Sequence, residues 1–464
     1  METRNLWNRY DADQLHKMEE VANWYKFCLD NGKTERECVR ISVDMAEKAG
    51  FRPLAEFMAD KKKKKLEPGT KVYAVYNEKT LVLYHIGKES IEKGMNILGA
   101  HIDSPRIDVK QNPLYERSGF AYFDTHYYGG IKKYQWVTIP LSLHGVVIKK
   151  DGTKIDINIG ESESDPVFVI SDLLIHLAQK QMKKTGTELV EGEKLDLLVG
   201  SRPAESSRPA KLRDKDSSAI KKNILEILKK KYGIEEEDFL SAELEIVPAA
   251  KASFVGFDES IIGSYGQDDR VCAYTALRAV LEAKAPEHTL LCVLTDKEET
   301  GSDGNTGMQG DYVVNFVNAL ADVEGAPIYK VLANSKCLSA DVNAAFDPNY
   351  PETMDRRNSA KLNYGVIITK YTGSGGKYGT SDASAEFLGY VRAFLDAGKV
   401  VWQTGNLGKV DFGGGGTIAK YIAERDVETV DVGVPILSMH APFELSAVND
   451  VYMTYRAFAE FDKK

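Results

Sequence analysis

The sequence predicts an α/β protein in which a mixed, mostly parallel β-sheet is flanked by helices and interrupted by a β-rich insertion. From residue 243 onward, apolar strand-like runs alternate with helical segments, the pattern of parallel strands joined by helices. Between 105 and 242 this alternation stops, and residues 137–160 have a hairpin pattern instead. We therefore predict one α/β domain from residues 1–104 and 243–464, with residues 105–242 inserted as a separate module.

The first part of the α/β domain contributes a helical segment and three strands. Residues 11–50 have apolar positions at three- and four-residue spacing, Asp11 or Asp13 as a cap, and Gly50 at the end. Short strand-like runs follow at 71–77, 80–87 and 95–103. The last run is apolar almost throughout, which is typical of a strand buried on both faces.

The insertion contains a hairpin around Asp151-Gly152, a predicted helix over 171–184 and a polar stretch over 201–218 that we expect to be a long loop. His176 lies in the predicted helix, where we expect it to pack; the alternative is that it reaches the site of a neighbouring subunit. The second part of the α/β domain alternates strands and helices. We expect strands at 243–249, 288–296, 336–342, 364–371 and 428–435, and helices at 269–283, 311–321, 382–397, 417–424 and the C-terminus.

Charge and cysteine usage narrow the class of protein. The net charge of −9 argues against nucleic acid as a partner, and we read the run Lys61–Lys65 as a solvated face. The five cysteines form no CxxC pair, which suits a reducing compartment. The N-terminus has no apolar signal region, and no apolar run approaches the roughly 20 residues of a membrane helix. We therefore expect a cytoplasmic protein without a membrane partner.

Polar residues follow the apolar strands at five places. Ligands bind beyond the carboxyl ends of strands in open α/β sheets, so we expect these residues to meet at one edge. Glu298 and Glu299 are adjacent, and neighbouring side chains on a strand point to opposite faces, which predicts separate roles for them. The five stretches carry His101 with Asp103, Asp268 with Asp269, Glu298 with Glu299, Asp341, and His440.

This residue set predicts a site for two divalent ions. Histidine and carboxylate ligands without a thiolate suit zinc, manganese or cobalt in a catalytic centre. Two such ions sharing a carboxylate would acidify a bridging water and polarise a carbonyl group, while a carboxylate that is not a ligand would accept the proton. Each feature alone has a simpler explanation: a histidine packed in the core, a solvated glutamate pair, or a helix N-cap at Asp268-Asp269. Five together favour the metal site.

The motifs HIDSPR, YGQDDR, DKEETGS, SADV and PILSMH resemble those of the dinuclear-metal aminopeptidases, specifically the aspartyl aminopeptidase/aminopeptidase I family. The resemblance covers nearly the whole chain, including YYGGIKK and FDPNY. It implies a peptidase α/β domain with an inserted dimerisation domain, and assembly into a tetrahedral dodecamer built from dimers.

The resemblance also implies roles for individual residues. His101, Asp268 and Asp341 would hold one metal, and Asp268, Glu299 and His440 the other, so that Asp268 bridges the two. Glu298 would be the general base, and Asp103 would orient His101 from behind. The two ions would be Zn²⁺, with Co²⁺ or Mn²⁺ as alternatives. The insertion lies between HIDSPR and YGQDDR, which favours an aminopeptidase over related carboxypeptidases and amidohydrolases.

Two departures from the family pattern concern the specificity pocket. Ala344 and Asp347 stand where histidines are expected, and Phe443 precedes Glu444 after the final histidine. Lys377 offers a cation for an acidic N-terminal side chain of the substrate, and the backbone of Gly414 and Gly415 allows close approach of a peptide. The alternative for Lys377 is a solvated lysine on a surface loop.

We therefore predict a metal-dependent aminopeptidase that hydrolyses N-terminal residues from peptides and has an acidic preference. An aminopeptidase of neutral or broad specificity is the first alternative. A catalytically silent shell or scaffold protein is the second, although the intact set of ligands and base argues against it.

Overall fold

The computed structural model describes residues 5–59, 66–204 and 218–464, and these form two compact units. One unit contains residues 1–104, 252–439 and 443–464, and the other contains residues 105–251 and 440–442. The lysine run 61–65 and most of the loop expected at 201–218 lie outside the described residues. No described helix is long and apolar enough to span a membrane.

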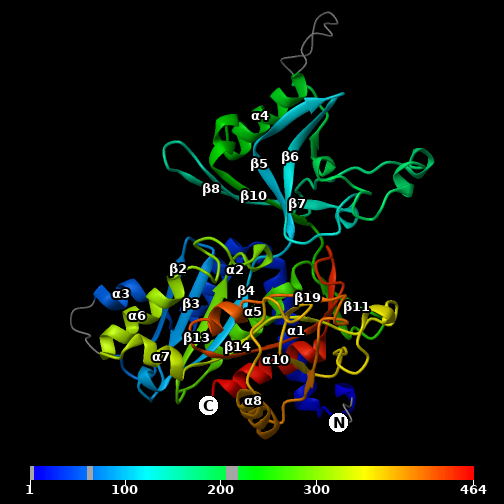
Figure 1. Cartoon of the computed structure of the whole chain (residues 1–464). Coiled ribbons are helices and arrows are strands. Elements are labelled where there is room, and N and C mark those ends of the chain that lie inside the picture. Colours follow the sequence, from blue (N-terminus) through cyan, green and yellow to red (C-terminus); the bar gives the residue numbers. More distant parts are fainter. Residues whose placement is uncertain (1–4, 60–65, 205–217) are drawn as a thin grey trace, which may run out of the picture. The chain divides into compact units, whose positions relative to one another are not determined.

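A nine-stranded mixed sheet forms the centre of the first unit (Figure 1). Neighbouring strands are parallel at β1–β2, β13–β4, β4–β14, β14–β20 and β16–β18, and antiparallel at the other three pairings. This confirms the predicted mixed, mostly parallel sheet. In sheet order the strands are β1 (Arg52–Pro53), β2 (Lys71–Tyr76), β3 (Thr80–His85), β13 (Thr289–Thr295), β4 (Met95–His101), β14 (Lys336–Ser339), β20 (Glu428–Gly433), β16 (Val366–Thr369) and β18 (Trp402–Thr404).

Helices cover both faces of this sheet, and the central strands are apolar on both sides for that reason. In β13, Leu290, Cys292 and Leu294 point into one core, whereas Leu291 and Val293 point into the other. The first core contains α1 (Ala12–Asn31), α2 (Glu35–Lys48), α5 (Gln267–Glu282), α8 (Ala385–Ala397) and α10 (Val448–Phe461). The second contains α3 (Leu54–Ala59), α6 (Tyr312–Glu324), α7 (Ile328–Asn334) and α9 (Ala419–Ala423).

The predicted helical segment 11–50 is two helices. Asp11 caps α1, and Gln14 completes its capping box, as the sequence indicated. The chain then breaks at Gly32, where a Cβ atom would lie 2.2 Å from the Tyr274 hydroxyl. Thr34 begins α2 with a second capping box. The break thus follows from a close tertiary contact together with a strong N-cap signal.

A second, five-stranded sheet in the same unit supports the N-terminus of α5. Its strands are short, and most of their residues were not predicted to be strands. The strands are β11 (Ser253–Val255), β12 (Ile261–Ser264), β22 (Glu444–Ala447), β21 (Pro435–Leu437) and β15 (Asn343–Ala344).

The second unit is built on a six-stranded antiparallel sheet and helix α4 (Ala219–Tyr232). The predicted hairpin is present as β7 and β8. We predicted that the α/β domain resumes at residue 243. Strand β10 instead pairs with β7 and β5, so the first unit resumes at residue 252. The strands are β8 (Lys154–Ile159), β7 (Leu141–Ile148), β10 (Ala242–Pro248), β5 (Arg106–Arg117), β6 (Phe120–Tyr128) and β9 (Leu197–Gly200).

The helix predicted over 171–184 was wrong. This segment contains two short 3₁₀ turns, Ile175–Leu177 and Gln181–Lys183, and His176 is exposed instead of packed. Helices in proteins are stabilised mainly by burial of an apolar face, and here the apolar side chains are exposed. Those with the largest exposed fractions are Leu174, Ile175, Leu177 and Met182.

Candidate active site

Three adjacent parallel strands bring the first candidate residues to one edge of the large sheet. Strand β4 lies between β13 and β14, and His101 is its last residue, paired in register with Thr295 of β13. Glu298 and Glu299 follow the end of β13, and Asp341 follows the end of β14. The sheet therefore positions residues that are far apart in the sequence at a common edge.

The Asp268-Asp269 pair lies at the N-terminus of α5, where both residues depart from helical backbone angles. The backbone N–H of Asp268 donates to Glu444 Oε2 (3.1 Å), and the Ser104 hydroxyl donates to the Asp268 carbonyl oxygen (2.9 Å). Glu444 is the buried glutamate that follows the altered C-terminal motif. These bonds hold the aspartate pair against the end of β4.

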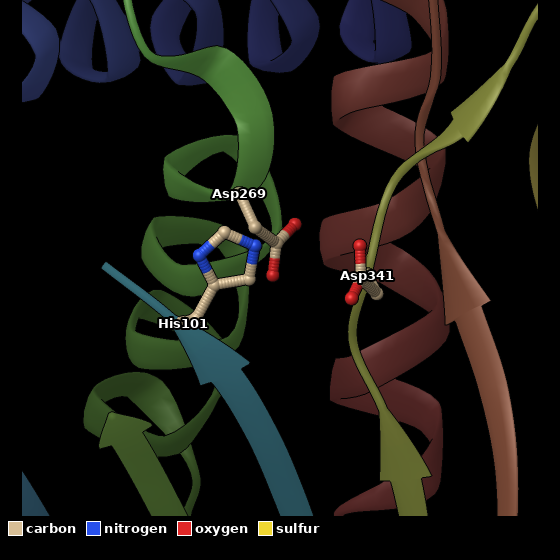
Figure 2. Close-up of side chains that lie close together, drawn as sticks. All are labelled: His101, Asp269 and Asp341. Atoms are coloured by element: carbon tan, nitrogen blue, oxygen red, sulfur yellow. The ribbon is translucent and has the colours of Figure 1, made fainter. Parts of the chain in front are cut away.

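Two groups of side chains bring possible metal ligands within 4.8 Å of one another: His101 with Asp269 and Asp341, and His101 with Asp268 and Glu299. Figure 2 shows the imidazole of His101 and the carboxylates of Asp269 and Asp341 turned toward one another. The resemblance placed Asp268 in both ligand sets. The structure has His101 in both groups, and it adds Asp269, which the sequence analysis mentioned only as the partner of Asp268.

Burial makes this arrangement electrostatically costly without a cation. Asp269 is fully buried, and among the described residues neither of its carboxylate oxygens receives a hydrogen bond of ordinary geometry. Burial raises the pKa of Asp269 well above its usual value, the neighbouring Asp268 raises it further, and His101 opposes the shift. Burial and the charge of Asp269 also raise the pKa of Asp341. A divalent cation would satisfy these oxygens, so the residues present fit a metal ion.

His101 responds to the same surplus of negative charge. Its Nε2 lies 3.3 Å from Asp268 Oδ1, and its Nδ1 lies 3.2 Å from Asp103 Oδ1. Burial opposes protonation, but the hydrogen bonds to Asp103 and Asp268 outweigh burial and raise the pKa of His101 well above its usual value. A positive charge is therefore favoured at Nε2, as a proton or as a metal ion.

Asp103 links the histidine to the glutamate pair. Besides its contact with His101, its two carboxylate oxygens accept the backbone N–H groups of Glu298 (3.1 Å) and Glu299 (3.2 Å). One buried carboxylate thus orients an imidazole and fixes the turn that follows β13. Such support is typical behind metal-binding histidines.

The two glutamates lie on a 3₁₀ turn, Glu298–Thr300, and not on the strand itself. The expectation that their side chains point to opposite faces of a strand was therefore wrong. Glu298 Oε2 lies 3.9 Å from His101 Nε2, and Glu299 belongs to the group with His101 and Asp268. Both carboxylates reach the same histidine from one turn.

His440 belongs to the other compact unit, with residues 105–251. Its Nδ1 lies 2.9 Å from the carbonyl oxygen of Gly130, and a Cβ atom on Gly130 would lie 3.4 Å from that nitrogen. A carbonyl partner on Nδ1 fixes the tautomer that carries its proton on Nδ1.

Lys377, Gly414 and Gly415 lie together in the first unit. Strand β19 (Gly414–Gly415) pairs with β17 (Gly373–Ser374), and Lys377 belongs to the turn after β17. Lys377 Nζ lies 2.7 Å from Asp382 Oδ2 and 4.0 Å from the centre of the Tyr371 ring. Lys377 also lines a cavity of about 280 Å³. Lys377 is exposed, and its ammonium group is paired with Asp382 beside the Tyr371 ring.

The chain matches the family described as "Aminopeptidase I zinc metalloprotease (M18)" over residues 28–461. The chain belongs to the M18 aminopeptidase family. A probable M18 family aminopeptidase 1 from Clostridium acetobutylicum is 48% identical over 464 residues, covering 99% of this chain and 98% of that protein. The corresponding protein from Thermotoga maritima is 44% identical over 469 residues, covering 100% of this chain and 99% of that protein.

Solved structures of M18 aminopeptidases have the same fold. The Thermotoga maritima crystal structure superposes with a TM-score of 0.93 at 43% identity, and that of Clostridium acetobutylicum aminopeptidase I with 0.91 at 47%. Each comparison covers 100% of both chains. This confirms the resemblance drawn from HIDSPR, YGQDDR and the other motifs. The chain is a metal-dependent aminopeptidase, a hydrolase of the zinc metallopeptidase class.

Proposed function

We propose that this aminopeptidase works with two divalent ions, zinc being the first candidate, and that Glu298 is its general base. The observation that carries the proposal is the fully buried carboxylate of Asp269, which lies between His101 and Asp341 without an ordinary hydrogen bond among the described residues. Such a carboxylate is costly unless a cation compensates it.

We assign the ligands as follows. His101 and Asp341 would hold one ion, Glu299 and His440 would hold the other, and Asp268 would be a ligand of both. The two ligand groups that share His101, one of which contains both Asp268 and Glu299, support this assignment. So does the carbonyl partner on Nδ1 of His440, which is typical of a metal-binding histidine. Asp269 is the competing candidate for the bridging position.

Two divalent ions at this position supply Lewis-acid polarisation of the scissile carbonyl and a water molecule of lowered pKa. The chain's own residues then direct the proton. Glu298, whose backbone N–H is fixed by Asp103, accepts the proton of the attacking water and returns it to the leaving amine. Asp103 keeps His101 and the turn that contains Glu298 and Glu299 in fixed positions during the reaction.

A substrate panel on the metal-stripped enzyme, reconstituted separately with zinc, cobalt and manganese, tests this function. We expect hydrolysis of peptides with a free N-terminus to return with two bound ions per chain, and N-acetylated peptides to remain intact. Full activity with a single bound ion, or without any, would contradict the two-ion mechanism.

An acidic N-terminal preference depends on Lys377. Lys370 and Lys377 share one carboxylate, Asp382, so this cluster carries one positive charge more than it neutralises. We propose that this surplus cation attracts an acidic side chain. Lys377→Ala should lower kcat/KM for Asp and Glu substrates more than for Leu substrates. An equal effect on all three would favour the alternative of neutral or broad specificity.

We further propose a homo-oligomer built from dimers, located in the cytoplasm. The exposed apolar side chains of the segment 167–182 support self-association. A structurally similar protein, at 21% identity, is a dodecamer of S. cerevisiae mApe1. The five cysteines are all free and buried, which fits a reducing compartment. Size-exclusion chromatography with light scattering tests the assembly, and a monomer would contradict it.

A further inference from the structure

Asp296 is a buried carboxylate of the first unit that lies outside both groups of possible metal ligands. It follows strand β13 directly, and only 1% of it is exposed. Its Oδ1 accepts the backbone N–H of Lys297 (2.8 Å), and its Oδ2 accepts the hydroxyl of Thr306 (2.6 Å). Asp296 therefore connects the residue before the two glutamates to a later point of the same loop.

Two buried carboxylates bind three successive backbone N–H groups at the start of the turn that contains the glutamates. Asp296 accepts the N–H of Lys297, whereas Asp103 accepts those of Glu298 (3.1 Å) and Glu299 (3.2 Å). The first N–H groups of a helical turn have no acceptor within the turn, so their acceptors must come from outside it. The two carboxylates supply these acceptors and thereby fix where the turn lies.

Lys297 has a backbone conformation that needs support from its surroundings. Its φ is +66°, in the left-handed region that residues other than glycine rarely adopt. Asp296 binds its N–H, and its carbonyl oxygen accepts the N–H groups of Ser302 (2.7 Å) and Thr300 (3.3 Å). Because Lys297 directly precedes Glu298, the direction in which the chain leaves Lys297 determines where the Glu298 side chain starts.

The hydroxyl that Asp296 accepts belongs to a residue held by two strands. The carbonyl oxygen of Thr306 accepts the hydroxyl of Thr80 in β3 (3.0 Å) and that of Thr295 in β13 (3.2 Å). Burial raises the pKa of Asp296, and the charge of Glu35 raises it further. Such a costly position for a carboxylate is common in active sites.

We propose that Asp296 is a positioning residue for the general base: by holding the N–H of Lys297, it keeps the Glu298 carboxylate beside His101. The inference rests on the proposed function in one respect, the role of Glu298 as the base. Glu298 Oε2 lies 3.9 Å from Nε2 of His101, the residue that belongs to both ligand groups. A base must lie within hydrogen-bond reach of the proton it accepts, and a displacement of about 1 Å can cost about 100-fold in rate. Asp296 affects the reaction only through the position of Glu298.

Two substitutions of Asp296 in the metal-loaded, full-length enzyme test the hydrogen bond separately from the charge. Asp296→Ala removes the acceptor of the Lys297 N–H. We expect kcat to fall by about 10- to 100-fold, KM to change by less than about twofold, and metal content to stay that of the wild type. Asp296→Asn keeps an oxygen for this N–H and should retain most of kcat. Asp303→Asn, at an exposed carboxylate of the same loop, is the matched control and should behave as wild type. Normal kcat in Asp296→Ala, or an equal loss in Asp296→Asn, would overturn the proposal.

A double-mutant cycle shows whether Asp296 acts through Glu298. A general loss of packing would lower kcat by the same factor with or without the base. If Asp296 positions Glu298, Asp296→Ala should change kcat by less than about twofold when Glu298→Gln is already present. An equal loss in both backgrounds would contradict the proposal. Should Asp296→Ala not fold, Thr306→Val takes its place in the cycle, because it removes the hydroxyl that holds Asp296 Oδ2.

Amide hydrogen exchange gives a readout that does not depend on turnover. Mass spectrometry of a peptide containing residues 296–300 should show faster exchange in Asp296→Ala than in the wild type, while peptides from β4 exchange at the wild-type rate. Unchanged exchange at 296–300 would count against the proposed tether.

Turnover of Glu298→Gln separates this inference from the proposed function. Full turnover in Glu298→Gln would remove the proposed base and this inference with it. A large loss of turnover in Glu298→Gln together with normal kcat in Asp296→Ala would leave the base standing and remove only the role of Asp296.

Discussion

At the scale of single residues, the charge balance around His101 explains why this edge of the sheet needs a cation. Asp103 and Asp268 contact the two ring nitrogens, and Asp269 and Asp341 lie nearby with their pKa values raised by burial. Without a metal, the carboxylates compete for protons. Divalent ions bound here would compensate the carboxylates of the ligands, Asp341 and one or both of the adjacent aspartates.

The two adjacent aspartates provide a matched pair for testing the bridging ligand. We expect Asp268→Asn to reduce the bound metal from two ions to one or none, because a shared carboxylate serves both ions. Asp269→Asn should retain more metal, because the proposed assignment does not use Asp269 as a ligand, although each aspartate lies in one of the two groups with His101. Metal content by atomic absorption after gel filtration measures both. The opposite order of metal loss would assign the bridge to Asp269.

At the scale of elements, capping residues set where the helices around the sheet begin. At the start of α2, the Thr34 hydroxyl accepts a hydrogen bond from the backbone N–H of Glu37. The Glu37 carboxylate in turn accepts one from the backbone N–H of Thr34. Both residues are buried, so water cannot replace either bond.

Removal of this cap should destabilise the first unit without changing the site. We expect Thr34→Ala to lower the free energy of unfolding by about 1 kcal/mol, because the N–H groups of the first turn lose their acceptor. Urea unfolding followed by circular dichroism measures the change. Thr34→Ser keeps the hydroxyl and should lose much less; an equal loss in both variants would assign the effect to packing of the methyl group.

Elements with a strong local pattern were predictable from sequence. The apolar run that ends at His101 predicted a strand buried on both faces, and β4 is such a strand. Strand β10 was also identified, but its own pattern does not reveal that its partners are β7 and β5. The segment 171–184 has a composition typical of a helix, but it forms 3₁₀ turns with exposed side chains. Its local pattern therefore predicted the wrong structure.

The sequence predicted most of the residues of the candidate site, because they follow apolar strands. It did not predict how their side chains are arranged. His101, Glu299 and Asp341 were identified because each follows an apolar run. Asp269 was not chosen as a ligand because the family resemblance assigned the bridging role to its neighbour Asp268. Its burial without an ordinary hydrogen bond is what points to a cation. The 3₁₀ turn that contains Glu298 could not be predicted from sequence either, because a tertiary contact with Asp103 fixes it.

At the scale of the whole molecule, one buried histidine predicts sensitivity to acid. His85 in β3 is 2% exposed, its Nδ1 has no hydrogen-bond partner among the described residues, and its ring packs edge-on against Phe51. Burial, with a smaller contribution from Lys71, lowers its pKa from 6.5 to about 4. The unfolded chain therefore binds a proton at a higher pH than the folded protein, so His85 makes stability fall as pH falls from 6.5 to 4.

Replacement of His85 should flatten this part of the stability curve. Between pH 7 and pH 4.5, we expect the urea midpoint of the wild type to fall further than that of His85→Phe, which keeps an aromatic ring beside Phe51. His16→Gln, at an exposed position, should follow the wild type. Loss of metal at low pH acts on all three proteins alike. Parallel curves for wild type and His85→Phe would exclude the histidine as a source of acid sensitivity.

The central claim, that the two neighbouring glutamates divide base and ligand roles, is tested most directly by metal content and turnover of Glu298→Gln and Glu299→Gln. Our account predicts that Glu298→Gln keeps two ions per chain while kcat falls by about 10² to 10⁴, the usual contribution of a general base. Glu299→Gln should lose bound metal together with activity. Full turnover in Glu298→Gln, or unchanged metal content in Glu299→Gln, would contradict this division of roles.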